Sequence, residues 1–285
     1  MVNKLSKSPI SATSLRVNAP LWFWQSLAAV FGALWGSFLN VVIYRVPRGE
    51  SVVSPPSHCP SCNAPVAFYD NIPVLSWLIL RGRCRRCHAP FSARYAIIEA
   101  LCGGLSFGLM TLFGPSFAFG YYFIFVFALV AISFIDLDTW LIPDVISLPV
   151  LAVGLAGAWF LPGHPLLAHV LGASIGGAGL LLMAFVIEKV LKKEGLGYGD
   201  VKLLAMIGAF TGVVTLPLVL ILASTQGAVI GLLWMALRKG PPKAAPDGFV
   251  PAASAVPFGP FLSLAALEIL VFGPQLLDLV ESLLG

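Results

Sequence analysis

Acidic residues at two places in this 285-residue chain are suited to acid–base chemistry. Asp136, Asp138 and Asp144 lie within nine residues at the end of an apolar stretch, with no basic residue among them. Since like charges at close range oppose ionisation, such a cluster has to be paired across the fold or to hold a proton. Asp144, directly after Pro143, also suits the first turn of a helix.

The second place is Asp200, which ends the motif Gly-Tyr-Gly-Asp at 197–200. Its glycines allow the backbone to bend and to approach other groups closely. Two aspartates brought together are the minimum equipment of an aspartic protease, in which the ionised carboxylate activates a water and the protonated one donates to the scissile carbonyl. We predict Asp136 and Asp200 as the catalytic pair, with Asp138 and Asp144 as second-rank candidates.

Four of the five cysteines form two Cys-x-x-Cys pairs, Cys59 with Cys62 and Cys84 with Cys87. Four thiolates in this arrangement match tetrahedral zinc, which would supply folding energy to a short loop. A reducing cytosol argues against two disulfides. We predict a structural zinc site, because four protein ligands leave no open position for water or substrate.

The composition indicates the class of fold that positions these residues. Charged residues make up 11% of the chain, against about 25% in a soluble domain, and the mean hydropathy is +0.92. These values exclude a soluble, disordered, coiled-coil or collagen-like chain, and a net charge of +4 is too small to indicate nucleic-acid binding. We predict an all-α polytopic membrane protein with about eight transmembrane helices, at 22–44, 96–114, 119–137, 143–161, 166–190, 201–215, 216–237 and 257–273.

The basic residues predict the orientation. With eight spans, 14 of the 17 Lys and Arg residues fall on one side, and only the three of the N-terminal tail fall on the other. By the positive-inside rule the loop 45–95 is cytoplasmic and both termini lie outside. We predict four parts: a tail (1–21), the first transmembrane helix (22–44), the cytoplasmic cysteine loop (45–95) and a membrane domain (96–285).

Several glycines recur at a spacing of four residues, which predicts faces where helices pack closely. These pairs are Gly32 with Gly36, Gly104 with Gly108, and Gly172 with Gly176. The segment 172–176 also fits the serine-hydrolase motif, but that motif needs a strand-turn-helix context that a membrane span lacks. The motif at 197–200 fits the end of a potassium-channel filter, but it lacks the filter's Thr-Val start and a preceding pore helix.

Five separated motifs occur together, and their combination resembles the prepilin leader peptidase/N-methyltransferase family. The resemblance covers residues 30 to 265, roughly, and the motifs appear in the family's order. They are Gly36-Ser-Phe-Leu-Asn-Val-Val-Ile-Tyr-Arg45, the two Cys-x-x-Cys pairs, Arg94-Tyr95 followed by Glu99, the stretch from Ile135-Asp136 to Pro143-Asp144, and Gly197-Tyr198-Gly199-Asp200.

The resemblance implies a bifunctional enzyme of the bacterial inner membrane that serves type IV pilus and type II secretion systems. Such an enzyme cuts the short basic leader of prepilins or pseudopilins at the cytoplasmic face and methylates the new N-terminus with S-adenosylmethionine. The family's catalytic aspartates fall on Asp136 and Asp200. Members with methyltransferase activity carry the four cysteines and a glycine and a glutamate, matched here by Gly82 and Glu99. Ala96 departs from the proline that many members have.

The alternative from another class is a non-catalytic membrane adaptor or transporter with a zinc ribbon. Membrane lipid is an expected partner in either case.

Overall fold

The structure, a computed structural model, describes residues 19–161, 165–191, 197–237 and 256–284. The predicted tail therefore lies almost wholly outside the described residues, as do the basic residues at 192–193, 238–239 and 243 that entered the orientation argument. Within the described ranges the regular elements are all helical: α1 (Leu21–Arg45), η1 (Val46–Arg48), η2 (Phe68–Asn71), α2 (Leu75–Ile79), α3 (Arg94–Phe113), α4 (Phe117–Thr139), α5 (Asp144–Ala158), α6 (Leu166–Leu191), α7 (Tyr198–Thr211), α8 (Leu216–Leu237) and α9 (Gly259–Leu284).

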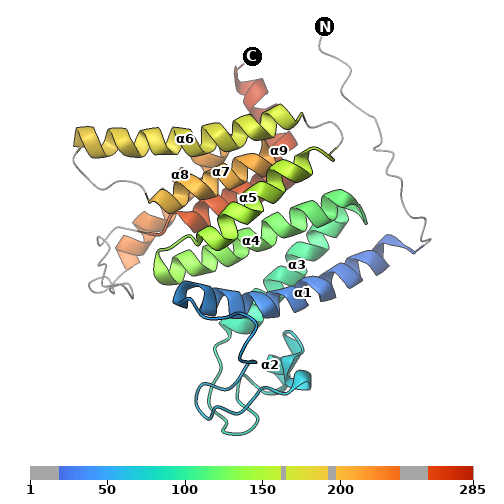
Figure 1. Cartoon of the computed structure of the whole chain (residues 1–285). Helices are drawn as coiled ribbons and strands as arrows, with labels where there is room; N and C mark the ends of the chain where they lie inside the picture. The colour runs from blue at the N-terminus through green and yellow to red at the C-terminus, as the bar shows by residue number, and fades with distance from the viewer. Residues whose placement is uncertain (1–18, 162–164, 192–196, 238–255, 285) are drawn as a thin grey trace.

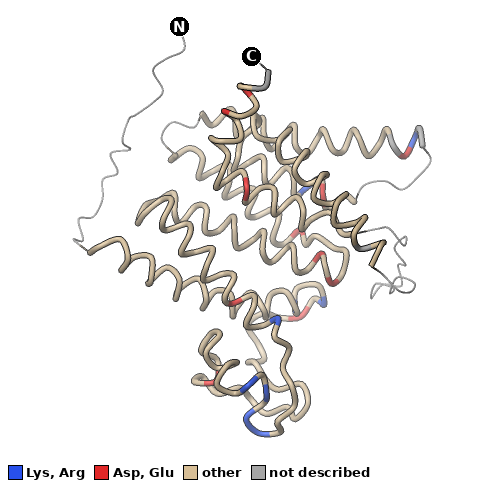
Figure 2. The backbone as a smooth tube through the Cα atoms, turned by 180° about the vertical axis from the view of Figure 1, so that it is seen from behind, with Lys and Arg blue, Asp and Glu red and all other residues tan. Residues whose placement is uncertain are grey.

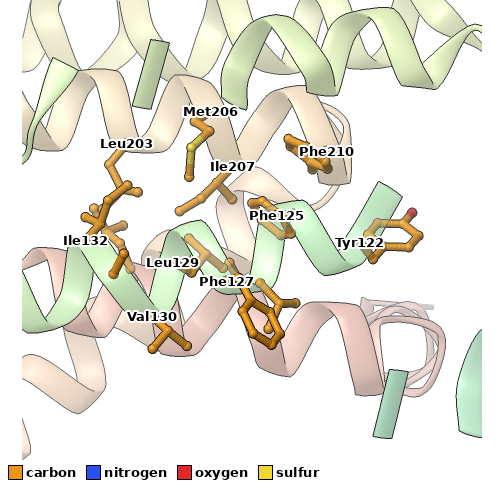
Figure 3. Close-up of a cluster of buried hydrophobic side chains, with 14 of the residues drawn as sticks. Tyr122, Phe125, Phe127, Leu129, Val130, Ile132, Leu203, Met206, Ile207 and Phe210 are labelled. Atoms are coloured by element: carbon orange, nitrogen blue, oxygen red, sulfur yellow. The ribbon is translucent and has the colours of Figure 1, made fainter. Parts of the chain in front are cut away.

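Helix α4 is the centre of the membrane domain, and it packs against α1, α3, α5 and α9. It is apolar on all sides, as expected for a helix surrounded by other helices. In Figure 3 the side chains of α7 face those of α4, and the rings of Phe125 and Phe210 stack with their centroids 4.3 Å apart. This contact holds the predicted catalytic helices together.

Each of the eight predicted spans corresponds to a helix, and six of them are long and apolar enough to cross a membrane. The exceptions are α5, with 15 residues, and α7, with 14. At 1.5 Å per residue both are shorter than the bilayer's hydrocarbon core of about 30 Å. The last span was predicted to end at 273, but α9 continues through Pro274 to Leu284. Membrane helices tolerate such a proline where other groups satisfy the freed backbone.

Two of the three glycine pairs are confirmed as packing faces. A Cβ on Gly36 would lie 2.9 Å from the Cα of Glu99 in α3, and one on Gly176 would lie 2.9 Å from the Leu204 carbonyl in α7. The prediction for Gly104 and Gly108 is wrong, because a Cβ on either would meet nothing within 4 Å. Their neighbour Gly103 faces α1 instead.

The cysteine loop forms a small separate module with α2, beside α1 and α3 (Figure 1). Many charged residues lie in this module and toward one end of the helix bundle, further acidic residues lie along α9, and most other helical positions are uncharged (Figure 2). Such a distribution fits a multi-pass membrane protein with its polar groups gathered toward one face.

Candidate active site

Asp136 lies in the last turn of α4, and its side chain is buried with 5% of the residue exposed. The helix ends just beyond it, because Trp140 adopts a left-handed conformation with a φ of 59° and Pro143 follows. One carboxylate oxygen of Asp136, Oδ2, accepts a hydrogen bond from the backbone N–H of Gly259 at 3.0 Å. The carboxylate is therefore held between two helices far apart in the sequence.

Asp200 lies in the first turn of α7 and is half-buried. Its Oδ2 lies close to Gly197, the residue that caps the helix: a Cβ on Gly197 would lie 3.4 Å from it. The first N–H groups of a helix have no intrahelical partners, so a carboxylate in the first turn is electrostatically favoured there. The glycine-rich motif therefore provides a favourable position for the Asp200 side chain.

The two aspartates come together across Ile142, in the short connection between α4 and α5. A Cβ on Gly199 would lie 2.9 Å from the Ile142 Cβ, and a Cβ on Gly259 would lie 3.3 Å from its Cδ1. The side chain of Ile142 therefore touches the backbone beside each aspartate. Ile142 thus places the two aspartates beside each other where α4, α7 and α9 meet. This proximity satisfies the first geometric requirement of an aspartic dyad.

Asp138 faces away from this pair and bonds to the start of α3. Its Oδ1 accepts from the Arg94 guanidinium at 2.7 Å, and Arg94 also donates to the Phe134 carbonyl at 3.1 Å. Asp144, in the first turn of α5, forms an ion pair with Lys202 of α7 at 2.5 Å. Each second-rank aspartate is therefore paired across the fold, which is one of the two outcomes that the sequence predicted for this cluster.

The four cysteines converge as predicted. Their sulfur atoms all lie within 4.8 Å of one another, and those of Cys59 and Cys87 are 3.7 Å apart. With zinc–sulfur bonds of about 2.3 Å, tetrahedral coordination places sulfur atoms about 3.8 Å apart. The four thiols thus fit one zinc ion.

The two knuckles repeat one backbone pattern. The N–H of Cys59 donates to the Ala64 carbonyl at 2.9 Å, and the N–H of Cys84 donates to the Ala89 carbonyl at 2.9 Å. Behind this repeat is a duplicated sequence, Cys-x-x-Cys-x-Ala-Pro at 59–65 and 84–90. This longer repeat, which the cysteine spacing alone does not reveal, predicts two equivalent half-sites.

A cavity of about 750 Å³ lies between the cysteine module and the helices α1 and α3. It is lined by aromatic and charged side chains together with the predicted residues Gly82 and Glu99. Glu99 is buried, and it accepts a hydrogen bond from the Val74 N–H of the loop at 2.7 Å. Gly82 has a φ of 65°, and a Cβ there would lie 2.9 Å from the Trp77 ring. Both residues therefore line a space large enough for a small-molecule ligand.

An ion pair stiffens the same module. Arg85 donates to both carboxylate oxygens of Asp70, with its Nε 2.8 Å from Oδ2 and an Nη 2.6 Å from Oδ1. These hydrogen bonds from Arg85 hold the pKa of Asp70 below its usual range. The arginine-rich stretch 81–86 therefore includes one member, Arg85, whose side chain is bound within the loop.

Comparison with known proteins agrees with this geometry. Residues 30–113 match the profile of the bacterial peptidase A24 N-terminal domain, and residues 123–232 match that of the type IV leader peptidase family. A prepilin leader peptidase/N-methyltransferase of Myxococcus xanthus is 37% identical, over 87% of this chain and 90% of the relative. One of Aeromonas hydrophila is 38% identical, over 90% and 93% of the two chains. The chain belongs to this family.

No solved structure matches this member of the leader peptidase family. Its structure also identifies site residues that the sequence motifs did not. Ile142 and Gly259 contact the aspartate site, and Lys202 pairs with Asp144 beside it. The segment Pro257-Phe-Gly-Pro260 signals a helix start, since proline is tolerated in the first helical turn, but nothing in sequence connects it with Asp136.

Proposed function

We propose that the protein is a membrane aspartic endopeptidase that cleaves the leader of prepilins or pseudopilins and methylates the new N-terminus. The observation that carries the peptidase half is the convergence of Asp136 and Asp200 from separate helices. Membership of the leader peptidase family indicates the substrate class. It also disfavours the alternative of a non-catalytic adaptor or transporter.

The proposed cleavage follows from two carboxyl groups sharing one proton. The ionised carboxylate takes a proton from water, whose oxygen attacks the scissile carbonyl carbon. The protonated carboxyl donates to the carbonyl oxygen, and collapse of the tetrahedral intermediate breaks the C–N bond and protonates the leaving amine. Burial of Asp136 favours this chemistry, because electrostatic interactions strengthen where water is excluded. Asp138 and Asp144 act outside this step, as the structural partners of Arg94 and Lys202.

The methyl donor, S-adenosylmethionine, is proposed to bind in the cavity lined by Gly82 and Glu99. The methyl group of its sulfonium would pass to the neutral N-terminal amine, which then loses a proton. Trp77 lines the same space, and aromatic faces attract cationic ligands. The volume of about 750 Å³ lies within the range of small-molecule sites.

Zinc is the metal proposed for Cys59, Cys62, Cys84 and Cys87. It would hold the two knuckles together and so maintain the floor of the cavity, because Cys59 and Cys84 also line it. Four cysteine ligands leave no position for substrate, which indicates a structural role.

The proposed arrangement keeps the predicted division into a tail (1–21), a first span (22–44), a cysteine loop (45–95) and a peptidase domain (96–285). It places the loop on the cytoplasmic side of the bacterial inner membrane and both termini outside. The prepilin's apolar segment would lie among lipid and helices, with its basic leader near the acidic residues around Asp136.

The test is cleavage of a prepilin peptide by the purified protein in lipid, with Asp136→Asn and Asp200→Asn compared with wild type. Each variant is expected to lose about a hundredfold or more in cleavage rate, since each removes an acid–base group. Both are expected to methylate a peptide that already carries the cleaved N-terminus, which reports an intact fold.

The matched control is Asp278→Asn, which changes an exposed aspartate in α9 and is expected to cleave at the wild-type rate. Full activity of either dyad variant would remove that residue from the mechanism. An inactive wild type, in lipid where a characterised relative is active, would overturn the peptidase proposal itself.

A further inference from the structure

Gly259, the first residue of α9, contacts the aspartate site from a third helix, in addition to α4 and α7. Its backbone N–H lies 3.0 Å from Oδ2 of Asp136, across 123 residues of sequence. The two family profiles match residues 30–113 and 123–232, so neither includes it. The contact is visible only in the folded chain, and it raises the question of what Gly259 contributes.

Sterics require glycine at this position. A Cβ on Gly259 would lie 2.5 Å from Oδ2 of Asp136 and 3.2 Å from its carboxyl carbon. Real Cβ atoms essentially never approach oxygen so closely, so any other residue has to displace the carboxylate or the helix. The same Cβ would lie 3.3 Å from Cδ1 of Ile142, a contact that a small side-chain movement relieves.

The hydrogen-bond pattern at the start of α9 directs this N–H at Asp136. Pro257 and Pro260 have no N–H to donate. The N–H groups of Phe261 and Leu262 both donate to the Phe258 carbonyl. The N–H of Gly259, by contrast, donates to the Asp136 carboxylate. It does so at a helix end whose dipole favours negative charge.

We propose that Gly259 is a positioning residue of the peptidase, which fixes Oδ2 of Asp136 and leaves Oδ1 to face the water or Asp200. The proposal rests on the proposed role of Asp136 in cleavage. It assigns to α9 a part in the reaction beyond packing, namely setting the orientation of one catalytic carboxylate.

The test is Gly259→Ala, assayed for cleavage, for methylation of a pre-cleaved peptide and for thermal stability in lipid. The added methyl displaces the carboxylate, so kcat for cleavage is expected to fall about tenfold to a hundredfold, as for other small misplacements of reacting groups. KM and the methylation rate are expected to stay within about twofold of wild type. Gly104→Ala, where a Cβ meets nothing within 4 Å, is the matched control and is expected to be unchanged.

A second variant separates positioning from simple packing. Ile142→Val removes Cδ1, which relieves the contact with an alanine at 259 but not the contact with Asp136. The double variant Gly259→Ala/Ile142→Val is expected to stay as impaired in kcat as the single one. Recovery of cleavage in the double variant would overturn the proposal, as would a wild-type kcat in Gly259→Ala or an equal loss of cleavage and methylation.

These outcomes are distinct from failure of the proposed function. If Asp136→Asn cleaves normally, the dyad itself is wrong. If Asp136→Asn is inactive and Gly259→Ala is fully active, only the role of Gly259 is wrong.

Discussion

The four aspartates Asp136, Asp138, Asp144 and Asp200 differ in what their carboxylates contact. Asp136 accepts a hydrogen bond from the backbone N–H of Gly259 at the start of α9, and the Asp200 carboxylate lies beside Gly197, which caps α7. Asp138 and Asp144 instead form ion pairs with Arg94 and Lys202. A carboxylate neutralised by a basic side chain is a poor proton donor, whereas a close pair without a basic partner shares a proton. This difference in partners distinguishes catalytic from structural candidates.

We therefore predict that Asp138→Asn and Asp144→Asn reduce cleavage by no more than about fivefold. Both ion pairs are partly exposed; the side chains of Arg94 and Asp138, for example, are 36% and 43% exposed. Such pairs contribute about 0–1 kcal/mol to the stability of the folded protein. Peptide cleavage assayed beside Asp136→Asn checks the prediction. A hundredfold loss in either variant would return that aspartate to the catalytic set.

At the scale of elements, the cysteine module depends on two short knuckles that enclose little apolar core. Its regular structure consists of η1, η2 and α2, none longer than five residues. The zinc ion that we propose for the four cysteines would join both knuckles and supply the missing folding energy. Cys59 and Cys84 of these knuckles also line the cavity. Loss of metal is therefore expected to open the cavity and to leave the membrane helices in place.

Cys84→Ser, or removal of the metal with a zinc chelator, is accordingly expected to reduce methyl transfer at least tenfold, while cleavage stays within a few-fold of wild type. Labelled methyl incorporation, peptide cleavage and metal content by atomic absorption measure the three quantities. Cys102→Ser is the matched control, because Cys102 is buried outside the cluster. If Cys84→Ser keeps one metal per chain and methylates fully, the metal site has no part in methyl transfer.

At the scale of the whole molecule, the position of the site constrains the path of the chain through the membrane. Asp136 lies in the last turn of α4, Asp200 in the first turn of α7 and Gly259 at the start of α9, and all three meet on one side. The chain leaves this side after Asp136 and is back there at Asp200, so α5 and α6 together must bring it back. In the same way, α7 and α8 together must bring the chain from Asp200 back to Gly259. Since α6 and α8 are long enough to cross, the short helices α5 and α7 must cross as well. We infer eight spans on this ground.

A phosphatase that is active only outside the cytoplasm tests this path. Fusions after Phe160, beyond α5, and after Val214, beyond α7, are expected to be active, and a fusion after Gly49 in the cysteine loop is expected to be inactive. Inactive fusions after both Phe160 and Val214 would contradict the eight-span arrangement. Protease treatment of sealed inverted vesicles provides an independent control. The cytoplasmic face points outward in such vesicles, so the cysteine loop is expected to be cleaved.

The sequence alone determined the class of the molecule, the helix positions and the grouping of the four cysteines. It also predicted zinc at these cysteines and Asp136 with Asp200 as the catalytic pair. These features depend on local or compositional signals, namely long apolar runs, the paired Cys-x-x-Cys spacing and motifs in a fixed order. The tertiary structure decided what each aspartate bonds to and which glycines pack, and it brought Ile142 and Gly259 to the site. Hydrogen bonds and steric contacts between residues 123 positions apart have no signature in one sequence, because they depend on how helices pack in three dimensions.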